Sequence, residues 1–450
     1  MLQPHSTGDL PAVRRASYGA NPQLGRHGSR ARLEILGAAR RLFAEHGYHG
    51  TTVEAIGAAA GRSGASVYQY FEGKGQIFGV FVAELVADVL AQARRFGALE
   101  RMEPGEETLA ELTGMVAELA EVLGRHSTTF ALWAVAEESE PALRGFFRHF
   151  ADGFADAVGP ALAALDVPES QRRPLAIAFG ATVQWAQATR AERTPDLPPA
   201  VLYEVLARVI YLAVCNADWR TDVPPVPAGP SVAQPPAPMA RPAAAERPAD
   251  PGSVPGVRRR VGPRSRATLD RILSAATAAF RRNGFHGTSL NDVAATAQVS
   301  HGSVYTYWAD RSALFTTLAH DAAVALADHF EGCRGAVATG PEGRAWLTSW
   351  FDVAAGHGAV LHIWTHEVLE DPRLGPLAQE MSGYVTAWLD VLLRGAPTAG
   401  AVDPVAGHLV LWSLLTDVPY TLGVQGGVLS REDLLDSITV LLRHGLLGYR

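Results

Sequence analysis

The chain has 450 residues, of which 48% are hydrophobic and 19% charged, with a net charge of −7 at pH 7; this balance allows two or more globular domains and excludes a disordered chain. Its two cysteines, Cys215 and Cys333, lie far apart and offer neither a disulfide framework nor a zinc-finger spacing, which favours a reducing cytoplasm. No signal peptide and no uncharged apolar run of about 18 residues is present, so we expect no membrane span.

The first predicted helix has apolar residues at helical spacing from Ile35 to Phe43, and Gly47 ends it. The segment TTVEAIGAAA then starts a second helix, in which Thr51 and Glu54 have the spacing of a capping box.

A three-residue break at 61–63 precedes the segment GASVYQYF (64–71), which predicts a short helix capped by Ser63. Two short helices joined by a tight turn form a helix-turn-helix motif. Small residues in the first turn of the second helix let its backbone approach base edges closely. We therefore predict a DNA-binding domain over residues 29–78.

Long amphipathic helices are predicted over residues 79–220, and a linker occupies 221–263. Twelve of the 43 linker residues are proline, which favours an extended, poorly packing conformation of about 3.1 Å per residue. Such a linker would not restrict the position of the domain after it. Residues 1–28 are also predicted to be a disordered arm.

The chain then repeats itself. Residues 35–78 align without a gap onto 272–315, with 17 of 44 positions identical, and HGSVYTYW (301–308) takes the place of GASVYQYF. Weaker similarity continues to the end of each copy. We predict an all-α protein with a second helix-turn-helix domain and a second helical domain. The segments concerned are 130–143 with 361–374 and 197–210 with 429–442, and the predicted second domains are 264–315 and 316–450.

Both predicted heads are basic although the whole chain is acidic. Residues 26–78 carry seven basic and four acidic side chains, and residues 258–315 carry nine arginines and three aspartates, net charges of +3 and +6. Small basic regions of this kind suit phosphate binding. The alternative, that the repeated octapeptide is a packing motif, fits its many hydroxyl groups poorly.

The order ILxAAxxLFxxxGYxxTTVxxIAxxAGxSxxxxYxYFxxK resembles the TetR family of bacterial repressors, and both copies match it over about 45 residues. The resemblance implies two TetR-like units fused in tandem. Each unit would have a three-helix DNA-binding domain and a larger helical domain that binds a small molecule and dimerises. It also implies double-stranded operator DNA and a small-molecule effector as partners, with no cofactor.

The resemblance places the functional contacts of the family on particular residues of each copy. Base contacts fall on Gly64, Ala65, Ser66 and Tyr68, and on His301, Gly302, Ser303, Tyr305 and Asn291. Phosphate contacts fall on Thr52, Gln69, Tyr70 and Lys74, and on Ser289, Thr306, Tyr307 and Arg311. Tyr68 and Tyr305 are expected to be partly packed.

The copies depart from the family pattern in different ways. The turn glycine is Gly61 in the first copy and Gln298 in the second, which predicts a strained second turn. Arg62 adds a charge to the first turn, and Glu54 stands where the second copy has Asn291. Because the two heads differ at base-reading positions, we predict unlike half-sites and an imperfect palindrome.

The helical domains hold candidate ligand-pocket residues, for which core packing or interhelical hydrogen bonding is the alternative: Trp133, Gln184, Trp185, His362, Trp364 and His366. His362 and His366 stand four residues apart, a spacing that could hold a metal, but no glutamate lies between them as in HExxH. We predict no metal site. No catalytic triad or phosphate loop is recognisable, so we predict no enzyme.

Together these features predict a cytoplasmic transcriptional regulator, a ligand-released repressor. The last two helices of each copy should pack as a four-helix bundle, giving an intramolecular pseudo-dimer whose recognition helices lie about 34–36 Å apart. Pairing between chains as a homodimer is the alternative assembly. The alternative function is a small-molecule sensor in which one or both heads no longer bind DNA.

Overall fold

The computed structural model describes residues 25–98, 105–215, 240–250, 253–332, 341–425 and 427–449. Every regular element in these ranges is a helix, and none of them contains a strand, which confirms the all-α prediction. The chain divides into two compact units. One comprises Met1–Ala93 with Glu121–Gly153, and the other Arg94–Ala120 with Phe154–Arg450.

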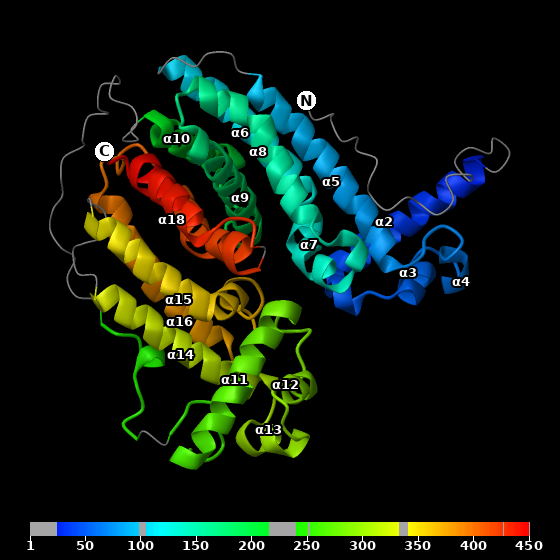
Figure 1. The fold of residues 1–450 in the computed structure, drawn as a ribbon, viewed down its shortest axis with the longest axis vertical. Helices are drawn as coiled ribbons and strands as arrows, with labels where there is room; N and C mark the ends of the chain where they lie inside the picture. Colours follow the sequence, from blue (N-terminus) through cyan, green and yellow to red (C-terminus); the bar gives the residue numbers. More distant parts are fainter. Residues whose placement is uncertain are drawn as a thin grey trace. The chain divides into compact units, whose positions relative to one another are not determined.

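The first copy begins with a helix that starts inside the predicted arm; residues 1–24 of that arm lie outside the described ranges. Its elements are α2 (Gly25–Gly50), α3 (Val53–Ala59), α4 (Gly64–Val67), α5 (Lys74–Gly97), α6 (Glu106–Arg125), α7 (Ser127–Ser139), η1 (Pro141–Leu143), α8 (Phe146–Ala164), α9 (Glu169–Arg193) and α10 (Pro199–Cys215) (Figure 1).

The second copy repeats this order, with one long helix where the first copy has α6 and α7. Its elements are η2 (Ala243–Ala245), α11 (Pro263–Asn283), α12 (Leu290–Thr296), α13 (His301–Tyr307), α14 (Arg311–Gly332), α15 (Pro341–His366), α16 (Gly375–Gly395), α17 (Pro404–Trp412), η3 (Ser413–Asp417), η4 (Pro419–Gln425), α18 (Arg431–Thr439) and η5 (Val440–Leu446).

Each head is built on the same aromatic cluster. In the second head Phe280, Phe285 and Phe315 are buried, with ring centroids 5.4–6.1 Å apart. In the first head Phe43 stacks on Tyr48 at 5.7 Å in the same way. Such pairs add about 0.5–1.5 kcal/mol each beyond the burial of their area. The repeated apolar pattern of the sequence therefore produces the same three-helix core twice.

The last helices of the two copies pack together inside the second unit. α10 lies along η5, and α9 contacts both α17 and α18. The approach is close: a Cβ added at Gly445 would stand 2.5 Å from the carbonyl oxygen of Val209. These are the helices for which the sequence predicts a four-helix bundle.

The helices of the second copy change to π geometry at this contact. η3, η4 and η5 are π-helical, whereas α9 and α10 of the first copy are regular α-helices. Val418 joins η3 to η4 in α-helical conformation, and Pro419, which has no backbone N–H, starts η4. π-helical turns commonly occur at functional sites. Here the wide turn brings Asp417, 1% exposed, into the interior.

The described part of the predicted linker is packed, which differs from the expectation of a poorly packing segment; residues 221–239 lie outside the described ranges. Arg241 forms ion pairs of 2.9 Å with Asp328 and Glu331 of α14. Ala245 is fully buried, and the Thr317 hydroxyl donates to the carbonyl of Pro255. Proline and alanine lower the entropy lost on docking, so this segment can bind a helix at little cost.

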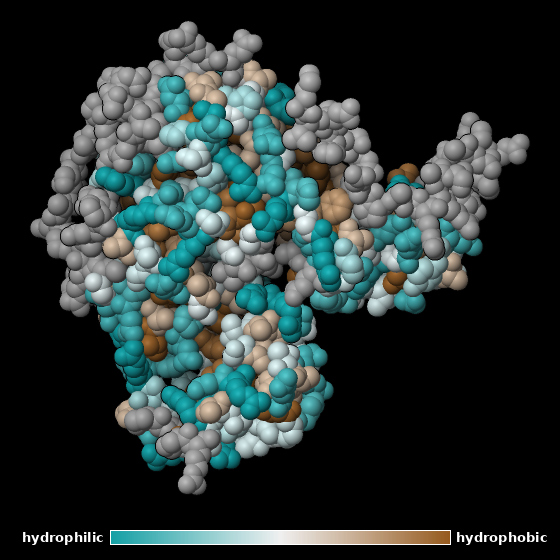
Figure 2. Space-filling model, in the orientation of Figure 1, coloured by the Kyte–Doolittle hydropathy of each residue, from teal (hydrophilic) through white to brown (hydrophobic). Residues whose placement is uncertain are grey.

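One helix in the described ranges, α5, is long and apolar enough to cross a bilayer, although Glu84 and Asp88 interrupt it, so it is not an uncharged apolar run. Half of its apolar window is nevertheless buried inside the protein, including Ile77, Phe81 and Leu85. A core helix of a soluble domain has the same properties. Hydrophilic residues cover much of the surface that Figure 2 shows.

Candidate nucleic-acid interface

Each recognition helix begins at a serine cap, as the sequence predicts. The Ser63 hydroxyl accepts from the Ser66 N–H at 3.2 Å and starts α4. Ser300 does the same for the Ser303 N–H at the start of α13. These caps hold the first turn of each helix open at the surface, where N-terminal residues can approach base edges.

In the first copy, the helix before the recognition helix, α3, is capped one residue later than predicted. Thr52, not Thr51, accepts from Ala55 N–H at 3.1 Å, so the predicted pair of Thr51 with Glu54 is wrong. Thr51 is fully buried and donates to the carbonyls of Leu42 and Gly47. In the second copy Ser289 is the cap, and its hydroxyl accepts from the Asp292 N–H at 3.2 Å and donates to the Asp292 carboxylate.

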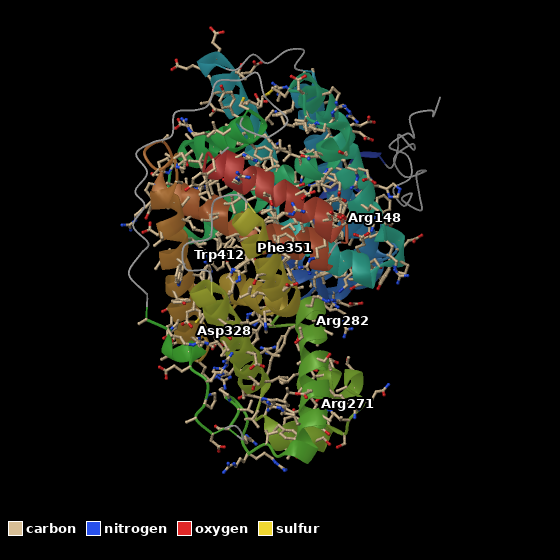
Figure 3. All side chains as sticks on the ribbon, turned by 60° about the vertical axis from the view of Figure 1, so that its left-hand side comes forward. Arg148, Arg271, Arg282, Asp328, Phe351 and Trp412 are labelled. Atoms are coloured by element: carbon tan, nitrogen blue, oxygen red, sulfur yellow. The ribbon has the colours of Figure 1, made fainter. Side chains whose placement is uncertain are left out.

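The turn before the second recognition helix has the backbone strain that its sequence predicts. Gly61 has φ +67°, and Gln298 at the same place in the repeat has φ +54°. A residue with a Cβ in this left-handed region costs about 1–2 kcal/mol. Arg271 on α11 compensates by donating to the carbonyls of Ala297 at 2.7 Å and Gln298 at 3.2 Å (Figure 3).

In the first copy an acidic residue of the first helix, rather than an arginine, stabilises the turn before the recognition helix. Glu34, which aligns with Arg271, accepts from Arg62 at 2.8 Å and from Arg30 at 3.0 Å. The hydrogen bond from Arg62 is the main cause that lowers the pKa of Glu34. Arg62, predicted to add charge near the DNA, is therefore already paired within the head.

The predicted base contacts lie on accessible turns of α4 and α13. Ala65, His301 and Gly302 are exposed, and the other small residues of these turns are half-buried. Tyr68 and Tyr305 are 54% and 45% exposed, so the expectation that they are partly packed is wrong. The rings of His301 and Tyr305 lie 5.9 Å apart and form one face in the second head. Asn291 and Glu54 are also exposed.

The predicted phosphate contacts differ in how far solvent reaches them. Four of them are exposed, but Tyr307 is only 6% exposed, because its ring packs beside Trp308 in the core; Tyr70 is half-buried. The exposed residues are Thr52, Gln69, Ser289 and Thr306.

Lys74 and Arg311 hold the backbone of their own heads. Lys74 donates to the carbonyls of Tyr48 at 2.8 Å and Thr51 at 3.1 Å. Arg311 donates to those of His286 and Thr288, and its guanidinium lies 4.3 Å from the Phe285 ring centroid. Burial lowers the pKa of both cations. They clamp the turn after the first helix, which explains why a cation is retained in both copies.

Three consecutive arginines lie beside the second recognition helix. The Arg258 N–H donates to the carbonyl of Tyr307 at 2.7 Å, and the Arg259 guanidinium lies 5.5 Å from its ring centroid. All three are exposed, and Arg260 pairs with Asp250. Sequence analysis counted these three arginines in the basic charge of the second head, but it placed them in the linker and assigned them no DNA contact.

The predicted pocket residues separate into three places. Trp133 is fully buried against Phe147 and Phe150 and belongs to the core. Trp364 lines a small apolar cavity of about 10 Å³ in the second copy with residues of α14 to α17 and η3. Trp185 contacts the rings of His362 and His366, while the Gln184 side-chain oxygen is buried without a partner in the described ranges.

A family description, bacterial regulatory proteins of the tetR family, matches this chain twice, at residues 35–80 and 272–318. The HTH-type transcriptional repressors AcnR of Corynebacterium efficiens and Corynebacterium glutamicum are each 38% identical to it over 72 residues. Those matches cover 16% of this chain and 38% of each relative.

Two solved structures align with part of this chain. The SmeT–triclosan complex is 23% identical with a TM-score of 0.33, over 41% of this chain and 90% of that chain. The fatty acid degradation regulator FadR from Bacillus halodurans is 18% identical with a TM-score of 0.31, over 43% of this chain and all of that one.

Proposed function

We propose, from the two matches to the tetR family at residues 35–80 and 272–318, that this chain is a cytoplasmic transcriptional repressor that binds operator DNA with both heads. The observation that carries the proposal is the pair of serine-capped recognition helices with exposed first turns. Exposed small and hydroxyl-bearing residues there can contact base edges, and the basic charge of each head suits phosphates.

The two copies act as the two subunits of a pseudo-dimer. The packing of α10 along η5 and of α9 on α17 and α18 supports this pairing. Such a bundle would present the two recognition helices one turn of DNA apart. The operator is an imperfect palindrome, because His301 and Asn291 face bases where the first copy has Gly64 and Glu54.

The effector is a mainly apolar molecule that binds the pocket lined by Trp364. The other lining residues include Leu326, Leu361, Met381 and Trp412, and the indole N–H groups of both tryptophans lack partners in the described ranges. A ligand that accepts these hydrogen bonds gains affinity and orientation. Binding that favours a different spacing of the heads would release the DNA.

Light-scattering mass, with and without DNA from the chain's own promoter, tests the assembly. We expect one chain on one operator, protected over two unlike half-sites in a footprint. A perfect palindrome under one chain would contradict the unlike half-sites. A stable two-chain particle would refute the internal pairing, and lack of salt-dependent DNA binding would favour a sensor with degenerate heads.

Replacing Arg258 and Arg259 by alanine should reduce the salt dependence of operator binding. Each lost phosphate contact lowers the slope of log K against log salt by about 0.9, so the double variant should lose about 2. Arg247→Ala is the matched control, because this exposed arginine of the same segment pairs with Asp328 on α14. An equal slope in wild type and double variant would remove these arginines from the interface.

A further inference from the structure

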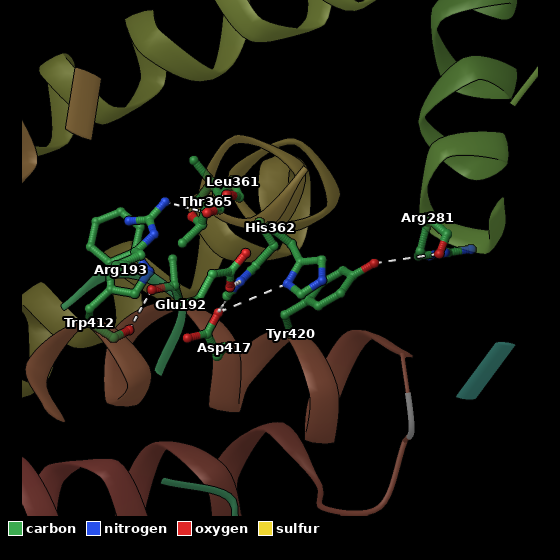
Figure 4. Close-up of polar contacts among 11 residues, drawn as sticks. Glu192, Arg193, Arg281, Leu361, His362, Thr365, Trp412, Asp417 and Tyr420 are labelled. Atoms are coloured by element: carbon green, nitrogen blue, oxygen red, sulfur yellow. Dashed lines mark hydrogen bonds and ion pairs between the residues drawn. The ribbon is translucent and has the colours of Figure 1, made fainter. Parts of the chain in front are cut away.

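A cluster of two histidines and one buried carboxylate lies where the two copies meet inside the second unit. His362 and His366 stand one turn apart on α15, and Asp417 lies beside both from η3. Figure 4 shows Asp417 beside His362. One ligand atom from each of the three lies within 4.8 Å of the others. From this geometry we infer that the chain has a divalent transition-metal site, of the zinc type, with His362, His366 and Asp417 as ligands.

The distances suit one ion. His366 Nε2 lies 3.3 Å and His362 Nδ1 4.0 Å from Asp417 Oδ1. Two ligand atoms on a tetrahedral zinc ion, at bonds of 2.0–2.2 Å, are about 3.3 Å apart. The distance from His362 Nδ1 to Asp417 Oδ1 would therefore have to shorten by about 0.7 Å. Three protein ligands leave a fourth position for water or an effector.

Two ligand atoms of the cluster are buried and lack hydrogen-bond partners. Among the described residues none bonds to His362 Nδ1 or to Asp417 Oδ2. Asp417 is 1% exposed, and an ionised carboxylate at that depth requires a nearby positive charge. A metal ion bound through Asp417 Oδ1 supplies that charge and gives His362 Nδ1 a partner.

A second carboxylate orients the site, and it comes from the first copy. Glu192 on α9 lies 3.3 Å from His366 Nδ1, the ring nitrogen that faces away from Asp417. Histidines that bind metals usually donate their other N–H to a carboxylate in this way.

Only one of the two copies carries the site. In the alignment that pairs Trp133 with Trp364, Ala131 and Val135 stand where the second copy has His362 and His366. The alignment of 197–210 with 429–442 places Trp185 opposite Asp417. The Trp185 ring lies 5.5 Å from both histidine rings and covers the cluster. We therefore expect one ion per chain.

The cluster also contacts the second DNA-binding head. Tyr420 stacks on His362 at 4.9 Å, and its hydroxyl lies 3.5 Å from the Arg281 carbonyl on α11. Glu367, next to His366, accepts from the Phe285 N–H at 2.7 Å. An ion at the cluster would thus be held between the first copy and the second head. The sequence predicted no metal site because nothing in it places Asp417 beside the two histidines. The contacts between these three residues lead us to revise that prediction.

Calorimetric titration of the chelator-treated, dialysed full chain with Zn²⁺ tests the site without DNA or effector. We expect one Zn²⁺ per chain, at least about 100-fold weaker binding in His366→Gln, and about 10-fold weaker binding in Glu192→Gln. His408→Ala is the matched control, because His408 has the same 22% side-chain exposure as His362 and also lies beside a carboxylate, Asp390.

The visible spectrum of Co²⁺ bound to the unmodified chain gives a second readout that no folding defect can affect. Intense bands of a four-coordinate ion with nitrogen ligands support the site. No stoichiometric binding to the wild type would overturn the proposal. Binding that survives His366→Gln in a variant with unchanged circular dichroism would overturn it equally, since the ion would then lie elsewhere.

Discussion

Gly302→Glu in the second recognition helix should weaken operator binding about 100-fold or more without unfolding the protein. Specific binding exceeds non-specific binding by about 10³-fold or more, and a head that cannot enter the groove loses most of that difference. Gly302 is exposed, and a Cβ added there meets no heavy atom within 4 Å, so the helix accepts the side chain. The new carboxylate would face phosphates and the acceptor edges of bases.

Ala65→Glu is the aligned change in the first head, and it tests whether that head contributes to operator binding as the second head does. Ala65 is exposed at the same place in α4. If both heads bind one operator, each single variant should lose a similar factor in fluorescence-anisotropy titrations, while Gly302→Ala should bind nearly as the wild type does. Unchanged binding in Gly302→Glu would mean that the second head does not contact DNA.

Gly445→Leu should be the most destabilising single change in the described ranges that we propose, lowering the free energy of unfolding by about 3 kcal/mol. An added Cβ would stand 2.5 Å from the Val209 carbonyl oxygen and 3.0 Å from Val209 Cγ1. Backbone cannot move aside as a side chain can, so the cost lies at the upper end of the usual 1–3 kcal/mol for overpacking. Chemical denaturation measures the loss.

Gly383→Ala is its control. Gly383 is exposed inside α16 with nothing within 4 Å of an added Cβ, so alanine should stabilise the helix by up to about 1 kcal/mol. If the copies pair through α10 and η5, Gly445→Leu should also lose tight operator binding, because the heads lose their fixed spacing. A Gly445→Leu variant as stable as the wild type would show that this contact does not form.

The heads could be predicted from sequence because local signals build them. Ser63 and Ser300 cap helices through the N–H groups of residues three positions later, and Gly61 takes the left-handed turn that glycine favours. The strain at Gln298 followed from the same rule. The repeat strengthened each prediction, since the same local pattern occurs twice.

Sequence did not predict single side-chain contacts correctly where two neighbouring residues, or two kinds of hydrogen-bond acceptor, were equally suitable and only the packing of the helices favours one of them. Thr51 and Thr52 are both able to cap a helix, and only the burial of Thr51 against α2 leaves Thr52 as the cap. Lys74 is long and charged enough for phosphate, but the open carbonyls of Tyr48 and Thr51 lie within its reach. Spacing in sequence cannot distinguish these outcomes.

Local sequence patterns suffice to predict that this protein is helical, that it contains the same unit twice, and that each unit has a serine-capped recognition helix, because caps, turns and apolar periodicity act over a few residues. Only the tertiary structure decided which groups meet across longer separations. It docks the arginines of 258–260 on α13, and it brings Glu192 and Asp417 to His366 across 174 and 51 residues. Such contacts depend on how whole helices pack, and no local pattern encodes them.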